Sequence, residues 1–286
     1  MDQLTSPALV AAAADLLGRP LVLDRELTGG QHARTLLVSG DVDHADHADH
    51  AVVRAFPRSD DAVVRELAVL HRLRPLGRLA PRLLAHGETD GHPLIVTEAL
   101  PGGPPAADLD PVVIGEQMGA ALAAIHRLDP AGLPDDVRRP TLRAGRLAAL
   151  AHEAWREADL ERVLTHGDFW SGNTLWEGDR LSGVVDWSGA RSAPRGVDLA
   201  WCRQDLVLLG SASAADRFLA AYEAAAGRRV PDVRAWDVIA AARADTYVET
   251  WAPNYAGVGR PEIDGRVLRQ RFDAWVRSLI GDRILR

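Results

Sequence analysis

The chain has no lysine, one cysteine and two methionines among its 286 residues, so all 33 of its basic residues are arginine. Any role that a lysine side chain fills in comparable proteins must therefore fall to an arginine here. The lone Cys202 excludes a disulfide within the chain and favours a reducing compartment. No apolar run approaches the roughly 18 residues that span a membrane, and no basic segment of a secretory signal precedes the apolar stretch 8–14. These absences predict a cytoplasmic protein that does not bind to a membrane.

The net charge and the length of the chain narrow the kind of protein further. A formal net charge of −7 argues against a nucleic-acid partner, for which a basic face would be expected. Hydrophobic residues make up 47% of the chain and charged residues 26%, which indicates an ordinary globular protein rather than a disordered one. A chain of 286 residues is long enough to bury a large core, and we expect two lobes.

The strongest break in the chain is Pro101-Gly-Gly-Pro-Pro105. Before it, between residues 20 and 100, short β-favouring runs separated by glycine or polar turns predict a region of five short strands and one helix. The clearest runs lie at 21–23, 35–38, 51–56 and 94–97, and the helix is expected over 59–73. Ser6-Pro7 predicts an earlier helix start, with Ser6 as the N-cap. After the break, we expect helices at 111–128, 141–160, 198–209, 214–226, 235–251 and 263–280.

The most informative segment is His166-Gly-Asp-Phe-Trp-Ser-Gly-Asn173, which is followed by the apolar run 181–185 and by Asp186. A single Asp or Asn in a polar loop is usually a turn residue or a helix cap. Here Asp168, Asn173 and Asp186 have the order and spacing that phosphoryl transfer requires, and they lie between apolar runs. Phosphoryl transfer from a nucleotide needs one group to orient the acceptor hydroxyl and hard oxygen ligands to hold Mg²⁺. The segment therefore indicates a kinase.

This motif, H-G-D-x₄-N followed by a V-V-D strand, closely resembles the aminoglycoside phosphotransferase family of small-molecule kinases. The resemblance implies an α+β, bilobal, protein-kinase-like fold, with a nucleotide-binding lobe at 1–100 and a helical lobe at 101–286. It implies that Asp168 is catalytic and that Asn173 and Asp186 bind Mg²⁺. His166 would brace the loop, and Asp198, in Gly-Val-Asp-Leu-Ala, would support it from the start of a helix.

On the nucleotide side, the glycine-rich turn Thr28-Gly-Gly-Gln-His32 lies between the first two expected strands, a position where its backbone N–H groups could approach phosphates. Arg54 stands at the strand centre where such kinases place a lysine, and Glu66 in the next helix would orient it. Glu98-Ala-Leu100 resembles the hinge whose backbone binds adenine. The residues expected to contact the nucleotide are Gly29, Gly30, Gln31, Arg54, Glu66, Glu98 and Leu100. ATP is the expected donor, and the sequence does not exclude GTP.

The sequence predicts the type of reaction more firmly than the identity of the acceptor molecule. The pocket is expected in the C-terminal helices, with Trp170, Asp205, Asp245, Glu249 and Trp251 as its residues. Asp245 and Glu249, four apart, are expected on one helix face, where they could receive an amine. An antibiotic of aminoglycoside or macrolide type is the first expectation. A metabolite kinase for an amino sugar, amino alcohol or sugar, and a nucleotide-binding pseudokinase, stay open, as do a monomer or a homodimer. The His- and Asp-rich stretch 41–50 is interpreted as a solvated loop, with metal binding there left open.

Overall fold

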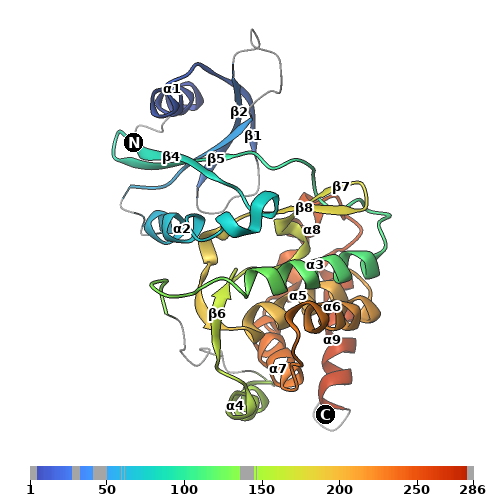
Figure 1. Ribbon diagram of the computed structural model, residues 1–286. Helices are drawn as coiled ribbons and strands as arrows, with labels where there is room; N and C mark the ends of the chain where they lie inside the picture. The colour runs from blue at the N-terminus through green and yellow to red at the C-terminus, as the bar shows by residue number, and fades with distance from the viewer. Residues whose placement is uncertain are drawn as a thin grey trace. The chain divides into compact units, whose positions relative to one another are not determined.

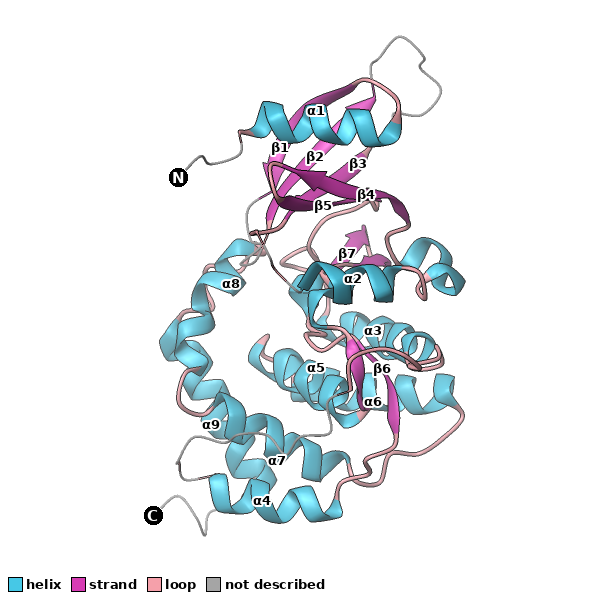
Figure 2. Ribbon diagram, turned by 90° about the vertical axis from the view of Figure 1, so that its left-hand side faces the viewer, coloured by secondary structure: helices cyan, strands magenta, loops and turns pink. Residues whose placement is uncertain are grey.

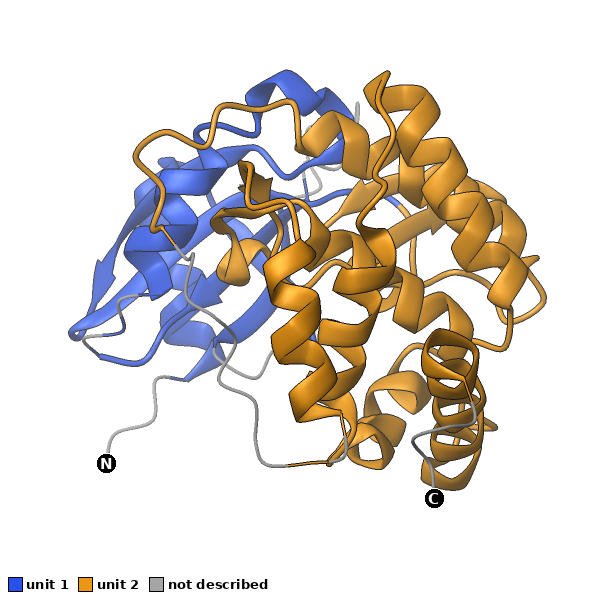
Figure 3. Ribbon diagram, turned by 90° about the horizontal axis from the view of Figure 1, so that it is seen from below, with its two compact units in different colours: residues 1–101 blue, residues 102–286 orange. Residues whose placement is uncertain are grey.

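The computed structural model describes residues 5–27, 33–40, 50–58, 60, 62–135, 145 and 147–281. The chain divides into two compact units, residues 1–101 and 102–286, drawn in different colours in Figure 3. An antiparallel sheet in the first unit and a mainly helical second unit confirm the predicted α+β class. None of the described helices is both long enough and apolar enough to cross a membrane.

The first unit is built on a five-stranded antiparallel sheet in the order β1-β2-β3-β5-β4 (Figure 1 and Figure 2). Its strands are β1 (Leu21–Leu27), β2 (Arg34–Gly40), β3 (Ala51–Ala55), β4 (Leu83–Thr89) and β5 (His92–Glu98). Its helices are α1 (Ser6–Leu17), α2 (Ala62–Leu70) and the 3-10 helix η1 (Arg74–Leu79). The central strand β3 pairs with β2 on one side and with β5 on the other.

Buried and partly buried side chains alternate along β3, so one face of the sheet belongs to the core of this unit and the other does not. Leu36 of β2 and Val53 of β3 are fully buried and pack with Leu9 and Ala13 of α1, which lies along one face of the sheet (Figure 2). Because successive side chains on a strand point to opposite faces, Arg54 lies on the other face from Val53. The strand thereby presents an arginine on the face away from the α1 core.

The second unit combines helices with two short antiparallel ladders. Its α-helices are α3 (Pro111–Ile125), α4 (Ala148–Glu157), α5 (Gly196–Leu208), α6 (Ala212–Ala226), α7 (Val233–Ala244), α8 (Ala252–Gly257) and α9 (Gly265–Ile280). Its 3-10 helices are η2 (Ser171–Asn173), η3 (Trp187–Gly189) and η4 (Val248–Trp251). Strand β6 (Arg162–Thr165) pairs with β9 (Arg191–Pro194), and β7 (Thr174–Glu177) pairs with β8 (Arg180–Val184).

Helices α3 and α6 pack with their backbones in close approach. A Cβ atom at Gly119 would lie 2.3 Å from the carbonyl oxygen of Phe218, and one at Gly115 would lie 2.5 Å from that of Ala214. These two glycines are four residues apart and therefore lie on the same face of α3. Any larger residue at either position would force the two helices apart.

Several predicted element boundaries are wrong. The first helix is capped by Thr5, whose side chain accepts a hydrogen bond from the N–H of Ala8 at 3.4 Å, and not by Ser6. The helix expected over 235–251 ends at Ala244, because Tyr247 leaves the helical conformation and Trp251 packs against it. Packing of these two aromatic rings outweighs the helical pattern. The helix expected over 59–73 is shorter, and strand β4 was not located from the sequence.

Candidate active site

The segment 166–173 links β6 to β7, and the segment 185–190 links β8 to β9. Because β6 pairs with β9 and β7 pairs with β8, both segments bridge the same two ladders and run side by side. The N–H of Val185 donates to the carbonyl oxygen of Asn173 at 2.9 Å. The sheet pairing therefore places Asn173 next to Val185, one residue before Asp186.

Two further contacts hold the segments together. His166 Nε2 donates to the carbonyl oxygen of Val185 at 2.9 Å, and its ring packs against that of Trp187 with centroids 4.7 Å apart. Gly167 has a φ of 84°, and a Cβ atom there would lie 2.2 Å from the carbonyl oxygen of Gly189. Only glycine fits at this crossing, because of both the backbone conformation and the close approach.

The carboxylate of Asp168 is held by two N–H donors. The indole Nε1 of Trp201 donates to Oδ1 at 2.8 Å, and Nδ2 of Asn173 donates to Oδ2 at 3.1 Å and to the Asp168 carbonyl oxygen at 2.8 Å. The N–H of Asp168 donates to Nδ1 of His166 at 3.3 Å. The two partners of the His166 ring therefore fix the tautomer that carries its proton on Nε2.

Asp186 has an unusual backbone. Its φ of 61° and ψ of 66° place it in the left-handed region, which it shares with Asp90 as the only non-glycine residues of positive φ among the described ones. Aspartate tolerates this conformation better than most residues. Its Oδ1 accepts a hydrogen bond from the hydroxyl of Ser188 at 2.8 Å. A held carboxylate with strained backbone at the end of a strand is typical of functional sites.

Helix α5 contacts the loop 166–173 through three side chains spaced along one face, at positions 198, 201 and 205. Asp198 accepts from the N–H groups of His166 at 2.7 Å and Gly167 at 2.8 Å. Trp201 donates to Asp168, as described above. Asp205 accepts from the N–H of Ser171 at 2.9 Å. The helix thus fixes the loop at its beginning, at its central carboxylate and near its end.

Asp198 is fully buried and also accepts a hydrogen bond from Nε2 of His126 at 3.2 Å. Burial alone would raise the pKa of Asp198, but the hydrogen bonds from His126 and Gly167 lower it below its usual value. Burial lowers the pKa of His126, which favours the neutral ring with its proton on Nε2. Its Nδ1 then accepts from the hydroxyl of Tyr222 at 2.9 Å. The loop 166–173 is therefore supported by a buried carboxylate of lowered pKa that accepts from an imidazole of lowered pKa.

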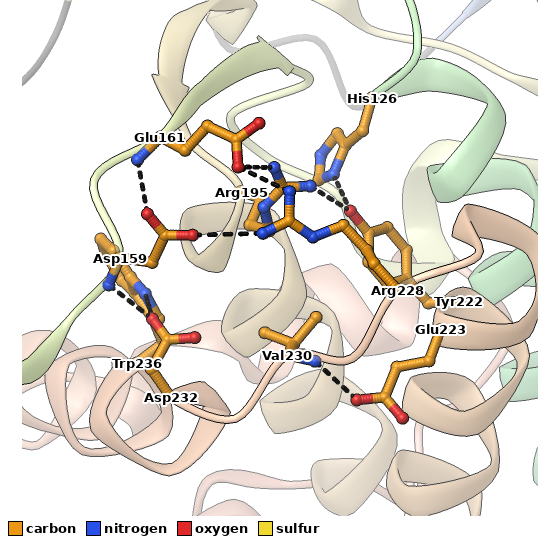
Figure 4. A network of polar contacts seen from close by, with 10 residues as sticks. All are labelled: His126, Asp159, Glu161, Arg195, Tyr222, Glu223, Arg228, Val230, Asp232 and Trp236. Carbon is orange, nitrogen blue, oxygen red and sulfur yellow. Dashed lines mark hydrogen bonds and ion pairs between the residues drawn. The ribbon is translucent and has the colours of Figure 1, made fainter.

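The chain of contacts continues from Tyr222 to the surface (Figure 4). Arg195 donates to the Tyr222 hydroxyl at 3.2 Å and pairs with Glu161 at 2.8 Å. Glu161 also pairs with Arg228 at 2.6 Å. Each residue from Asp198 to Glu161 thereby contacts the next through a polar atom, which favours a single arrangement of the loop, although Nε of Arg195 is buried without a hydrogen-bond partner among the described residues.

The residues expected to form the acceptor pocket fall into two groups. Trp170 and Trp251 are half-buried: Trp170 packs on Tyr255 with centroids 5.8 Å apart, and Trp251 packs on Trp201 at 5.3 Å. Asp205 lies inside the protein, where it accepts from the hydroxyl of Tyr255 at 2.9 Å and where burial raises its pKa. Trp251 is linked to Asp168 through Trp201, and Trp170 follows Asp168 by two residues in the loop, whereas Asp205 has a structural role in holding the loop.

Asp245 and Glu249 do not share a helix face, because Asp245 follows α7 and Glu249 lies in η4. They converge instead on Arg269 of α9. Its guanidinium donates to both carboxylate oxygens of Glu249, at 2.5 and 2.8 Å, and to Oδ1 of Asp245 at 3.2 Å. The bond to Arg269 lowers the pKa of Glu249. Both carboxylates therefore already have a cationic partner inside the protein.

In the first unit, Arg54 of β3 forms an ion pair with Glu66 of α2, and both side chains are largely buried. The Arg54 guanidinium also lies 5.3 Å from the centre of the Phe56 ring. At the end of β5, the N–H of Glu98 donates to the carbonyl oxygen of Arg82 at 2.9 Å, and its carboxylate pairs with Arg82 at 3.1 Å. Leu100 follows, immediately before the boundary of the unit. Gly29, Gly30 and Gln31, and the stretch 41–49, lie outside the described residues.

Sequence reasoning missed Trp201 and Arg269. Trp201 stands three residues after Asp198 on a predicted helix, so the face that Asp198 turns toward the loop must also carry position 201. That spacing was a usable signal. Arg269 gave no such signal, because it lies 20 residues after Glu249 and 24 after Asp245 in another helix.

Comparisons with known proteins identify a family and several similar folds. A family model described as the phosphotransferase enzyme family matches residues 25–239. The structure of the macrolide 2'-phosphotransferase MphH from Brachybacterium faecium is 22% identical, with a TM-score of 0.61 over 92% of this chain and 97% of that chain. The aminoglycoside-3'-phosphotransferase of type VIII is 20% identical, with a TM-score of 0.58 over 83% of this chain and 98% of that chain.

A variant of aminoglycoside phosphotransferase APH(4)-Ia, in a ternary complex with ADP and hygromycin B, is 17% identical. Its TM-score is 0.58 over 95% of this chain and 98% of that chain. At these identities the structural likeness establishes the fold. Comparison with curated proteins finds no matching sequence.

Proposed function

Because this chain belongs to the phosphotransferase enzyme family, we propose that it transfers the γ-phosphoryl group of ATP to a hydroxyl of a small molecule in an Mg²⁺-dependent reaction. The observation that carries this proposal is the pairing of segments 166–173 and 185–190. It places Asn173 beside Val185 and Asp186, and it turns the amide of Asn173 toward the carboxylate of Asp168. Three groups suited to phosphoryl transfer are thereby held by backbone and side-chain contacts in one part of the second unit.

The donor set of this site fits Mg²⁺. Because Nδ2 of Asn173 donates to Asp168, the atom of that amide able to bind a cation is its oxygen, and Asp186 supplies a carboxylate. Within the described residues, no group of three or more His, Cys, Asp or Glu could hold a metal alone. Mg²⁺ commonly takes one or two protein oxygens and completes its shell with water and phosphate. When bound, it would neutralise charge on the phosphate oxygens.

Asp168 is the proposed catalytic residue. Each of its carboxylate oxygens accepts one N–H, and a carboxylate oxygen has a second lone pair with which to accept the hydroxyl of an acceptor. The main contribution would be orientation of that hydroxyl toward phosphorus, because the loose transition state of phosphoryl transfer needs little prior deprotonation. His166 and Asp198 touch the loop and not the carboxylate itself, so we assign them a supporting role.

Arg54 is the proposed phosphate-binding cation, held in place by Glu66. In the hinge, the N–H groups of Glu98 and Ala99 donate to Arg82 and His50 within the first unit. Recognition of the base would then fall to the backbone of Leu100. Backbone recognition gives no basis for choosing between ATP and GTP, so both are to be assayed.

The acceptor is proposed to be an antibiotic, and the half-buried rings beside Asp168 favour a sugar-bearing compound of macrolide type over a polycationic aminoglycoside. Trp201, Trp251 and Tyr247 form a run of edge-to-face contacts, and aromatic faces stack well on the apolar face of a sugar. The guanidinium of Arg243 lies 5.6 Å from the centre of the Trp201 ring and would oppose an acceptor that carries several cationic groups there. Asp245 and Glu249, which could have attracted an amine, are paired with Arg269.

A metabolite kinase acting on a sugar is the second candidate, and the same aromatic rings support it. An amino alcohol or amino sugar has less support, because its amine would need a carboxylate without a partner. A pseudokinase is disfavoured, because Asp168, Asn173 and Asp186 are all present and the first two are hydrogen-bonded to each other.

The test is transfer of labelled phosphate from γ-³²P-ATP, and separately from γ-³²P-GTP, to a set of acceptors with and without Mg²⁺. The set contains erythromycin, hygromycin B, glucosamine, glucose and choline. A phosphorylated macrolide that disappears when Mg²⁺ is chelated supports the proposal. Labelled glucose in its place would support the metabolite kinase, and nucleotide binding without transfer to any acceptor would support the pseudokinase.

A further inference from the structure

We infer that Trp201 is a positioning residue that holds the carboxylate of Asp168 in the orientation needed for phosphoryl transfer, an inference that rests on the proposed function. Its indole Nε1 lies 2.8 Å from Oδ1 of Asp168. This is the shorter of the two contacts to the carboxylate, because Nδ2 of Asn173 lies 3.1 Å from Oδ2. Asn173 binds the Asp168 carbonyl oxygen more closely, at 2.8 Å, and so anchors the backbone more than the side chain.

The indole group suits this role chemically. An indole N–H can donate but cannot accept, and it carries no charge. It can therefore restrain the carboxylate without taking the proton of an acceptor hydroxyl and without forming an ion pair that would compete with that hydroxyl. The contact also differs from that of Asn173, which is a proposed Mg²⁺ ligand and has two functions to serve.

The ring of Trp201 is itself held on two sides. The Trp251 ring meets it edge-on, with centroids 5.3 Å apart and planes at 65°, and the guanidinium of Arg243 lies 5.6 Å from its centre. Its backbone belongs to α5, whose Asp198 and Asp205 are hydrogen-bonded to the same loop. The donor is therefore built on a rigid helix and restrained by packing, as a positioning group requires.

The first test asks whether the hydrogen bond exists in solution and does not depend on activity. ¹⁵N-tryptophan labelling gives eight indole signals, one for each tryptophan. Trp201→Phe and Trp236→Phe identify two of them. Trp236 is a matched control, because its Nε1 donates to the carboxylate of Asp232 at 2.9 Å, away from the loop. Asp168→Ala should shift the Trp201 signal and speed its hydrogen exchange, while the Trp236 signal stays. An unmoved Trp201 signal would overturn the inference.

The second test removes the donor and keeps the shape. Site-specific replacement of Trp201 by 3-benzothienylalanine puts sulfur in place of the N–H. With erythromycin and hygromycin B as probe acceptors, kcat should fall about 10- to 100-fold while KM for ATP and for the acceptor changes less than about threefold. The same replacement at Trp236 should leave kcat within about twofold. A merely structural role would not give this split between kcat and KM.

The outcomes separate the two proposals. If the natural chain transfers phosphate and the replacement at position 201 leaves kcat unchanged, the positioning role is wrong and the proposed function stands. Equal losses of kcat at positions 201 and 236 would also overturn the positioning role, because they would reflect a general effect of the replacement. If the natural chain transfers phosphate to no acceptor, the proposed function fails and the positioning role with it, although the indole spectrum still decides whether Trp201 binds Asp168.

Discussion

Replacing Asp198 with asparagine is expected to destabilise the protein by about 2.5–4 kcal/mol and to reduce turnover, although the side chain keeps its size. The carboxylate of Asp198 is fully buried and accepts three hydrogen bonds. Those from His166 and His126 go to Oδ2, and that from Gly167 goes to Oδ1. The asparagine amide has only one oxygen, so its NH₂ group must take the place of one carboxylate oxygen. There it faces a backbone N–H group of the loop, and two donors cannot form a hydrogen bond with each other.

The expected loss of stability is worked out for the amide orientation that breaks the fewest hydrogen bonds. If the amide oxygen replaces Oδ2, the N–H of Gly167 loses its acceptor, which costs about 1.5–3 kcal/mol for a bond to a charged group. The remaining two bonds become neutral and weaken by about half, which adds about 1 kcal/mol. A typical domain is stable by about 5–15 kcal/mol, so the protein should still fold, and urea unfolding can measure the loss.

Asp205→Asn is the matched control, on the same helix and also buried. Its partners are the N–H of Ser171 at Oδ2 and the hydroxyl of Tyr255 at Oδ1. A hydroxyl can accept as well as donate, so an asparagine can satisfy both partners. We expect a loss below about 1 kcal/mol and turnover close to that of the natural chain. Equal losses for the two substitutions would refute the hydrogen-bond account of Asp198.

Three further predictions concern stability and nucleotide binding. Burial holds the pKa of His126 below its unfolded value of 6.5, so at low pH the unfolded chain binds a proton that the folded chain does not. The free energy of unfolding therefore falls as the pH drops below about 6.5, by up to about 1.4 kcal/mol per pH unit. Urea unfolding of His126→Gln should lack this contribution, and an unchanged pH slope would contradict it. Burial raises the pKa of Asp237 to about 6, and its carboxylate pairs with buried Arg203 at 3.1 Å. Asp237→Leu should lower the free energy of unfolding by about 3–5 kcal/mol, and adding Arg203→Leu should restore most of that loss. Additive losses for the two substitutions would refute the pairing. Arg54→Ala should weaken ATP binding more than adenosine binding by about 1–3 kcal/mol in calorimetry, and equal losses would show that Arg54 is structural.

The sequence predicted the parts of the site that depend on local order. The loop 166–173 and Asp186 could be recognised because their chemistry is read from residue type and spacing along the chain. The position of Arg54 on the sheet face opposite Val53 also follows from alternation in β3, which is a local property. Their roles in nucleotide and metal binding stay predictions until they are measured.

The parts that could not be predicted depend on contacts between distant segments. Asp245 and Glu249 fit an open helix face in the sequence, but Arg269 of α9 pairs with both, and nothing near them in the chain indicates this. Asp205 was expected to face an acceptor, and its carboxylate instead holds the loop through Ser171. A carboxylate on an amphipathic pattern has the same sequence signature whether it faces solvent, a ligand or an internal partner.

The measurement that tests the account most directly is a steady-state comparison of the natural chain with Asp168→Asn, using whichever acceptor the labelling assay identifies. Asparagine keeps the size of the side chain and can still accept from Trp201 or from the acceptor hydroxyl, but it lacks the charge that orients that hydroxyl. We expect kcat to fall about 100-fold or more, with ATP affinity by calorimetry within about twofold of the natural chain. Near-normal kcat in Asp168→Asn would contradict the assignment of this loop as the site of phosphoryl transfer.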